Sequence, residues 1–476
     1  MEYTCLSDFP IRSGNLTLWR TEAETAEAWE LDNRPLTSQH EKYCGEFDSL
    51  DERPGRGKWI GTIFEMDAPL DRRAVRDLIW VWHARHEGLR TTARVAAPGA
   101  RPARFTCAAL GVKVIREVVD AVSDGDQLGP YLSAEFERRL SPAAWPHCLV
   151  ATIEHHDTDD FTVLVAADHS VMDAYGQALI INEFRALYRA LLDGSRIEAL
   201  TTCASSADYA VLERQAAATV TADCPATLAW RNFFDSCDGK FPSFPPLPST
   251  VYDPARESEQ NSFSRWLLDN SESDLIEAAA TARGYRLTAV IFAALAYASY
   301  RVSGTSEFRT IMPVATRPSA QWAESMGWFV NIVPLSVTVG PDRSFDSALH
   351  DAAAALKAVR PLTMVPAGPV CELLEIADTP RFGVSFVDMR RVPGVDTIGS
   401  LRHRLLRAES YSPDEVYFWV GRTVDGLNIS TRFPASFPLS EMDRFIGEFV
   451  GGLREFAGGA VPALEVIDAA VGCGAA

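Results

Sequence analysis

The sequence lacks the features that would place the chain in a specialised class of protein. Its nine cysteines are scattered singly without a C-x-x-C pair, which disfavours a zinc ribbon or a disulfide framework. The start, Met1 to Cys5, has no basic segment followed by an apolar core, so we expect no secretory signal. The longest apolar run, Leu287 to Tyr300, is too short to cross a bilayer. We therefore expect reduced thiols, a cytoplasmic location and no membrane span.

Positive charge is also in deficit. The chain has 45 Lys and Arg against 64 Asp and Glu, a formal net charge of −19, which disfavours nucleic acids and anionic membranes as partners. Its 47% hydrophobic and 23% charged residues are ordinary for a globular protein. Adjacent histidines at 155 and 156 precede a run of aspartates, which predicts a polar hairpin turn. We therefore predict no metal site there.

The length of 476 residues predicts two domains, because one hydrophobic core seldom organises so long a chain. Four prolines between Phe241 and Pro248 exclude a helix interior or a central strand there. We predict an N-terminal lobe over residues 1–235, a Pro-rich linker over 236–255 and a C-terminal lobe over 256–476. The first twenty residues show little periodicity, and we expect them to pack at most as an edge strand.

A strand, a polar loop and a helix follow one another around His169. The run Phe161 to Ala167 is apolar, rich in β-branched residues and without alternation, which is typical of a strand buried on both faces. Apolar residues between Gly176 and Leu192 recur at helical spacing. His169 thus follows a strand, where a histidine can act as a general base. Asp173 would orient its ring or hold the loop. The alternative is a satisfied histidine followed by a helix N-cap.

Two further stretches allow competing interpretations. Residues 84–91, with the sequence ARHEGLRT, end a predicted helix, and we interpret their charges as a solvated helix terminus. In residues 326–335, MGWFVNIVPL, glycine, aromatic residues and Asn331 indicate either backbone that passes close to a ligand or a sheet edge with a satisfied asparagine.

Five stretches together resemble the condensation-domain superfamily of nonribosomal peptide synthesis, which includes chloramphenicol acetyltransferase. They occur in the family's order and are PLTSQ (35–39), ARHEGLRT (84–91), DHSVMDA (168–174), MPVATRP (312–318) and MGWFVNIVPL (326–335). Later stretches, residues 382–394 and 416–433, look more like free-standing polyketide-associated (PapA-type) acyltransferases and discrete condensation enzymes. Asp168 and Ala174 depart from the family's HHxxxDG pattern. The first histidine of that pattern is thought to be structural in the family.

The resemblance implies an α/β fold of two chloramphenicol acetyltransferase-like lobes in a V, each a mixed sheet flanked by helices, with an active-site tunnel between them. His169 would be the catalytic base, and Asp173 would pair with Arg317 in a structural role. Because backbone amides at a helix N-terminus can stabilise an oxyanion, we add a set of candidate donors and loop residues. These are Ala174, Tyr175 and Gly176, and the tunnel candidates are Asp168, Trp328 and Asn331.

The implied activity is acyl transfer from a pantetheine thioester, carried by an acyl or peptidyl carrier protein or by coenzyme A, to a small alcohol or amine. The likeness to the acyltransferase branch favours an alcohol acceptor and an ester product. An amide-forming condensation enzyme is the alternative, and a noncatalytic carrier-protein docking module is the alternative of another class. We expect a monomer without a bound cofactor or metal, since the substrate itself carries phosphopantetheine.

Overall fold

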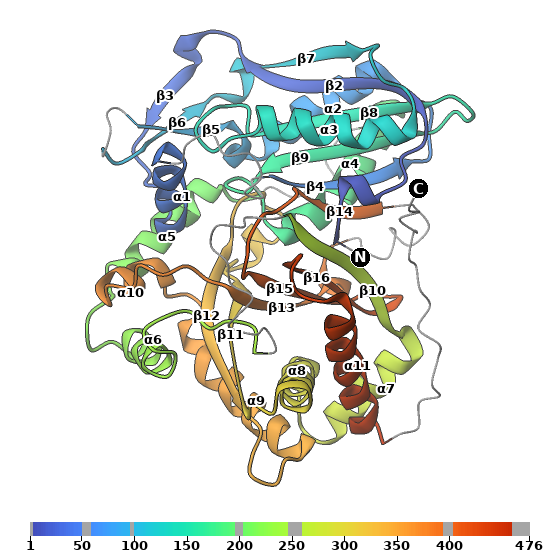
Figure 1. The fold of residues 1–476 in the computed structure, drawn as a ribbon. Helices are drawn as coiled ribbons and strands as arrows, with labels where there is room; N and C mark the ends of the chain where they lie inside the picture. Colours follow the sequence, from blue (N-terminus) through green and yellow to red (C-terminus); the bar gives the residue numbers. More distant parts are fainter. Residues whose placement is uncertain are drawn as a thin grey trace.

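The fold is built on two separate β-sheets, one above the other (Figure 1). The computed structural model describes residues 3–49, 59–95, 100–195, 203–245, 259–393 and 403–458. The first sheet has the strand order β1 (Tyr3–Cys5), β14 (His403–Arg407), β4 (Trp59–Met66), β9 (Phe161–Asp168), β8 (Cys148–His155), β2 (Gly14–Ala23) and β7 (Val112–Val119). Its pairs are antiparallel except β1 with β14.

Both faces of the first sheet are covered, which explains the unbroken apolar run of β9. Every residue of β9 is buried. One face packs against α2 (Arg72–Arg85) and α4 (Ala174–Leu192), and the other packs against α3 (Gly125–Arg139). A small sheet of β3 (Trp29–Asp32), β6 (Ala103–Cys107) and β5 (Thr91–Arg94) lies beside it. The strand, loop and helix predicted around His169 therefore have the predicted order and type.

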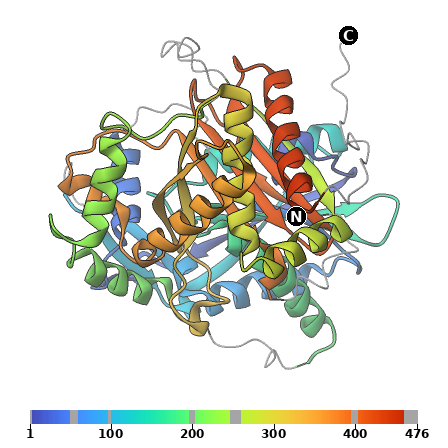
Figure 2. The same cartoon turned by 90° about the horizontal axis from the view of Figure 1, so that it is seen from below.

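The second sheet is mixed. Its strand order is β10 (Gln260–Asp269), β16 (Gly426–Pro434), β15 (Val416–Arg422), β13 (Phe382–Asp388), β11 (Glu307–Ala315) and β12 (Val330–Thr338). Its core is formed with α7 (Asn270–Ala282), α8 (Leu287–Ser303), α9 (Phe345–Val359) and α11 (Leu439–Phe456). Seen from below, α8 and α11 lie in front of the strands, so the other face of this sheet is turned toward the first lobe (Figures 1 and 2).

Three further helices complete the junction between the lobes, namely α1 (Ser38–Ser49), α5 (Ser206–Ala217) and α10 (Ala367–Leu373), and α6 (Pro225–Asp235) packs on the second lobe. Two sheets flanked by helices confirm the predicted α/β class and the two lobes. The strand β1 lies at a sheet edge as expected, whereas β2 lies in the interior of the first sheet.

The strand β14 does not follow the predicted division of the chain. Residues 403–407 fall within the predicted C-terminal lobe, yet they pair with β4 in the first sheet. The chain therefore returns from the second lobe to add a strand to the first. The predicted lobe boundaries stay a prediction, and residues 246–255 of the predicted linker lie outside the described residues.

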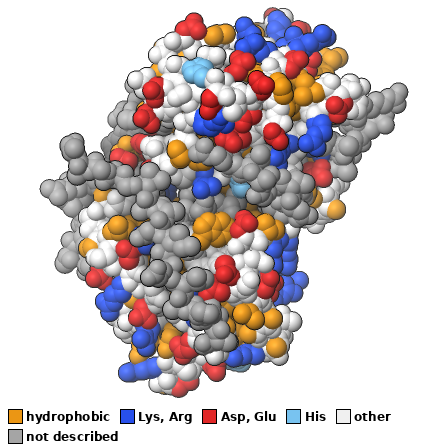
Figure 3. All heavy atoms as spheres, turned by 90° about the vertical axis from the view of Figure 1, so that its right-hand side faces the viewer, with side chains coloured by type: hydrophobic (Ala, Val, Ile, Leu, Met, Phe, Trp, Pro, Cys, Tyr) orange, Lys and Arg blue, Asp and Glu red, His pale blue; other side chains and the backbone are white. Residues whose placement is uncertain are grey.

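Charged side chains of both signs are interspersed over the two lobes on the face drawn in Figure 3. Among the described residues, no helix is both long enough and apolar enough to cross a bilayer. On the face drawn in Figure 3, the acidic excess is therefore spread among basic side chains.

Gln177 fastens the start of α4 to the first sheet. It is 1% exposed, and its Nε2 donates to the carbonyls of Gly61 in β4 and of Leu406 in β14, the second at 2.9 Å. Thr62 donates through Oγ1 to the Gln177 carbonyl at 2.8 Å. The helix that follows the His169 loop is thereby held against two strands.

We expect Gln177→Met to lower the free energy of unfolding by about 1 to 3 kcal/mol, because two buried carbonyls lose a donor. Urea titration followed by circular dichroism measures this loss. Gln127→Met, at an exposed position of α3, is the matched control and should leave the unfolding midpoint unchanged. Equal effects of the two substitutions would contradict the role of Gln177.

Candidate functional site

His169 lies in the loop between β9 and α4. Its ring centroid is 4.9 Å from that of Trp328, a residue of the second lobe, and the two planes meet at 41°. Burial lowers the pKa of His169 below its ordinary value of 6.5, against an opposing contribution from the charge of Asp173. Its Nδ1 is buried and has no hydrogen-bond partner among the described residues. The imidazole is thus held neutral near pH 7, which is the state a general base requires.

Asp173 does not orient that ring, because its carboxylate is occupied elsewhere. It is 1% exposed and caps α4 by accepting from the Gly176 amide at 2.7 Å. Arg317 donates to both carboxylate oxygens, at 2.9 and 3.0 Å, and the Phe329 amide donates at 3.1 Å. The contact between Asp173 and Arg317 that the resemblance implies is therefore present. Four donors on two oxygens leave Asp173 poorly placed to move a proton.

The second lobe supplies Arg317 and Phe329 from the two ends of a loop between β11 and β12. The Arg317 guanidinium lies 4.4 Å from the Tyr175 ring centroid and 4.6 Å from that of Phe329. Gly327 has φ +156°, and a Cβ there would come within 2.7 Å of the Phe329 ring. A side chain at Gly327 would displace Phe329, whose amide reaches Asp173.

The three predicted oxyanion donors are not equivalent. Ala174, Tyr175 and Gly176 do form the first turn of α4, as expected for amides at a helix N-terminus. The Gly176 amide, however, donates to the Asp173 side chain as part of the helix cap. Gly176 is therefore unsuited to bind an oxyanion, because the N-cap aspartate uses its N–H.

Asp168 is not among the residues that line the cavity described below, although its partner Tyr43 is one of them. It is fully buried at the end of β9, where one carboxylate oxygen accepts from the Ser170 amide at 2.9 Å and the other from the Tyr43 hydroxyl at 3.2 Å. The structure thus gives Asp168 a contact that shapes the turn after β9. Its assignment to a tunnel wall stays a prediction.

A cavity of about 270 Å³ lies between the lobes. Residues from α1, α5, β12, α10 and the adjoining loops line it, among them the predicted tunnel residues Trp328 and Asn331. Trp328 also contacts His169, so it stands between the cavity and the base. Asn331 donates to the carbonyls of Thr363 and Val365, at 3.1 and 2.7 Å, and accepts from the Ala367 amide. Asn331 therefore fastens the cavity wall, the satisfied state that we left open as an alternative.

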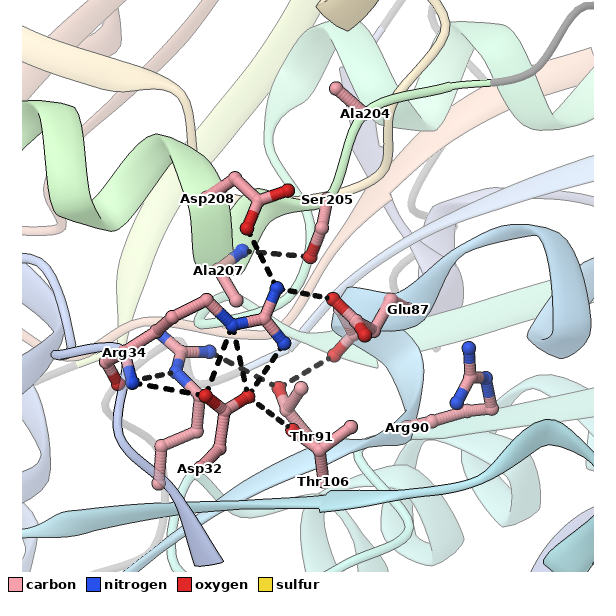
Figure 4. Close-up of polar contacts among 12 residues, drawn as sticks. Asp32, Arg34, Glu87, Arg90, Thr91, Thr106, Ala204, Ser205, Ala207 and Asp208 are labelled. Atoms are coloured by element: carbon pink, nitrogen blue, oxygen red, sulfur yellow. Dashed lines mark hydrogen bonds and ion pairs between the residues drawn. The ribbon is translucent and has the colours of Figure 1, made fainter.

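One arginine holds the helix that forms the opposite wall. Figure 4 shows the Arg34 guanidinium among Asp32, Glu87 and Asp208, which it contacts at 2.6, 2.8 and 2.8 Å. Burial opposes the ionised form of Asp32, yet hydrogen bonds from Arg34 and Thr106 lower its pKa. Because Asp208 belongs to α5, this network positions the helix whose Tyr209 and Glu213 line the cavity.

The charged stretch 84–91 is not solvated, and our interpretation of it was wrong. Arg85 bridges Glu183 of the first lobe and Glu324 of the second, at 2.5 Å each. His86 is 2% exposed and contacts Glu183 at 2.8 Å. Burial opposes its protonation, but the Glu183 charge and the hydrogen bonds with Cys203 and Glu183 together outweigh burial and raise the pKa of His86 to about 9. The stretch is a buried ion cluster that joins the lobes.

Among the described residues, no group of three His, Cys, Asp or Glu side chains is arranged to hold a metal ion. What the site offers is a neutral buried imidazole, a helix N-terminus beside it and a cavity behind Trp328. These parts suit transfer of a group whose acceptor must lose a proton.

Comparison with known proteins points to one family. The Condensation domain family matches residues 60–388. Acyltransferase PapA3 of Mycobacterium tuberculosis H37Rv is 28% identical over 238 residues, which are 49% of this chain and 50% of that protein. The chain thus spans about half the length of this curated relative.

Solved structures show the same fold. The PapA2 acyl transferase structure has a TM-score of 0.86 at 21% identity and covers 96% of this chain and 100% of its own. The first condensation domain of the calcium-dependent antibiotic synthetase has a TM-score of 0.68 at 18% identity, with 91% and 98% covered. At these identities the likeness establishes the two-lobed architecture.

We expect Arg317→Met to lower the free energy of unfolding by about 3 to 5 kcal/mol, because it leaves the Asp173 charge buried without its cation. Urea titration with tryptophan fluorescence measures the loss. Arg138→Met, which removes an exposed cation beside Glu135, is the control and should cost no more than about 1 kcal/mol. A loss at Arg317 no larger than at Arg138 would show that Asp173 does not depend on this partner.

Proposed function

The chain belongs to the Condensation domain family, and on that premise we propose that it is an acyltransferase that moves an acyl group from a pantetheine thioester to an alcohol, with an ester as product. The observation that carries this proposal is the buried, neutral His169 beside a cavity between the lobes. The likeness to PapA3, whose name is acyltransferase, supports the class of reaction.

In this mechanism His169 takes the hydroxyl proton while the acceptor oxygen attacks the thioester carbonyl. The tetrahedral intermediate then collapses, the carbon–sulfur bond breaks, and the proton passes from His169 to the departing thiolate. Donor and acceptor are held together, so proximity supplies much of the acceleration and no acyl-enzyme forms. The amides of Ala174 and Tyr175, at the N-terminus of α4, are the donors we assign to the oxyanion.

The donor's phosphopantetheine arm arrives on a carrier protein or as coenzyme A, and the protein itself holds no cofactor. On this proposal the protein works as a monomer in the cytoplasm. The eight free cysteines among the described residues are suited to that reducing compartment. Trp328 separates His169 from the cavity, so the substrate that fills the cavity reaches the base past this side chain.

We expect His169→Ala to lower kcat by about 10²- to 10⁴-fold, the usual contribution of a general base. Mass spectrometry of products from a panel of acyl thioesters and pooled alcohols and amines measures turnover. His156→Ala, at an exposed histidine of the first lobe, is the matched control and should keep full activity. Unchanged turnover in His169→Ala would refute the mechanism. Absence of any product, with carrier protein still bound, would point to a docking module.

The pH dependence gives a separate test. His169 acts only when unprotonated, and its lowered pKa keeps it unprotonated to lower pH than a histidine in water. We therefore expect kcat to stay level near neutral pH and to fall only below 6.5, the ordinary histidine value. Initial rates in buffers of constant ionic strength measure this limb. A rate that falls with a midpoint above 6.5 contradicts the assignment.

A further inference from the structure

A stack of alternating guanidinium and aromatic groups lies between the two sheets. It consists of Tyr3, Arg407, Trp419, Arg432 and Tyr417, and we name it the cationic ladder. The Arg407 guanidinium carbon is 3.3 Å from the Trp419 ring centroid and 4.1 Å from that of Tyr3. The Arg432 carbon is 5.2 Å from the Tyr417 ring centroid and 6.0 Å from that of Trp419. Two cations are thereby held close together by aromatic faces.

The ladder has more positive charge than its surroundings neutralise. Arg432 contacts Glu415 at 3.2 Å, but no carboxylate among the described residues forms an ion pair with Arg407. The Nε atoms of both arginines are buried without a hydrogen-bond partner among those residues. Burial, with a smaller contribution from the Arg432 charge, lowers the pKa of Arg407 to about 10, although Tyr3 opposes this shift. One cation therefore lacks a counter-charge among the described residues.

Other buried arginines of this protein are compensated. Arg317 has Asp173, and Arg422 has Asp274. Arg90 and Arg104 form no ion pair with a carboxylate in the part of the chain that the structure describes, but they donate to backbone carbonyls. A guanidinium whose planar faces stack on aromatic rings, and which has an N–H group without a partner, can donate hydrogen bonds to a carboxylate, sulfate or phosphate. Arg407 has this form.

The ladder lies close to the proposed site. On β14, Arg407 is opposite Ile60 of β4, which is opposite Ala167 of β9, two residues before His169. The Arg407 charge is near enough to lower the pKa of His169. On β15, Val416, Phe418 and Val420 face the helices of the second lobe, so Tyr417 and Trp419 face the first lobe. A group bound by Arg407 would thus lie between the lobes near the base.

We propose that the cationic ladder binds an oxyanion, a carboxylate or a sulfate or phosphate ester, carried by the acceptor alcohol. This inference rests on the proposed acyl transfer for the identity of the substrate, but not for the binding of an anion. The phosphate of a pantetheine donor is separated from the thioester by the length of its arm, whereas Arg407 lies near the reacting centre. An anionic acyl group is the other source of the same chemistry, and the experiment separates the two.

The binding test uses inorganic sulfate as the probe. Thermal unfolding of the wild-type protein is followed in sodium sulfate and in sodium chloride at matched ionic strength. We expect a saturable rise of Tm in sulfate, which Arg407→Gln loses. Arg404→Gln removes the same charge from the other face of β14 and should keep the saturable rise. Sulfate also stabilises proteins generally, without saturation, and that rise should be common to all three.

The same site can be located without a variant, in case Arg407→Gln does not fold. Crystals of the wild-type protein soaked in sodium selenate, a sulfate analogue, should show anomalous selenium density within hydrogen-bond distance of the Arg407 guanidinium. No density there, or a saturable rise of Tm that survives in Arg407→Gln, would overturn the proposal.

The turnover test identifies the source of the anion. It compares 3-hydroxybutyrate with 1,3-butanediol as acceptors, and glutaryl-coenzyme A with pentanoyl-coenzyme A as donors. We expect the charged acceptor to have a kcat/KM about 10- to 100-fold higher, mainly through KM, as a charge-assisted hydrogen bond predicts. That ratio should approach one in Arg407→Gln and persist in Arg404→Gln. A preference confined to the charged donor would overturn the assignment to the acceptor.

The outcomes separate the two proposals. Saturable sulfate binding that depends on Arg407, with no product from any pair, would refute the acyl transfer and leave the anion site standing. Product from the uncharged pairs, with neither a charge preference nor saturable sulfate binding, would refute the anion site and leave the acyl transfer standing.

Discussion

One buried carboxylate, that of Asp173, accepts hydrogen bonds from both halves of this protein. Asp173 is 1% exposed, and a charge so placed is stable only when donors surround it. One donor is the Gly176 amide of its own helix, and the others, Arg317 and the Phe329 amide, come from the second lobe. The loop that holds His169 therefore has its geometry only when the lobes are docked. Separation of the lobes would expose the Asp173 carboxylate to solvent. The loop that holds His169 would then lose its contacts with Arg317 and Phe329.

The parts of the site set by local pattern were predictable. An unbroken apolar run predicts a doubly covered strand, and helical spacing predicts α4, so His169 fell at a strand end. The contact of Arg317 with Asp173 came from the resemblance alone, because the two residues are 144 positions apart and no local pattern links them. The roles of these residues in catalysis stay predictions. The two lobes were expected from length, and the sheets confirm them.

The parts set by distant partners were not predictable. The stretch 84–91 has the composition of a solvated helix end, but its counter-charges Glu183 and Glu324 lie 98 and 239 residues from Arg85. A charge run alone cannot show that such partners exist. Likewise nothing in residues 403–407 shows that they join the first sheet, since the residues of a strand do not specify the strand with which it pairs. The Gly176 amide became unsuitable only through the cap geometry.

The inter-lobe region contains an arginine that has a carboxylate partner, Arg317, and one that has none among the described residues, Arg407. Arg317 has its carboxylate within the protein, so it holds one fixed arrangement, whereas Arg407 keeps a charge that an incoming anion can neutralise. The Arg407 charge lowers the pKa of His169. An oxyanion bound at the cationic ladder would cancel that field and make His169 a stronger base. On this proposal the base gains strength when the acceptor arrives, which couples occupancy of the site to proton removal.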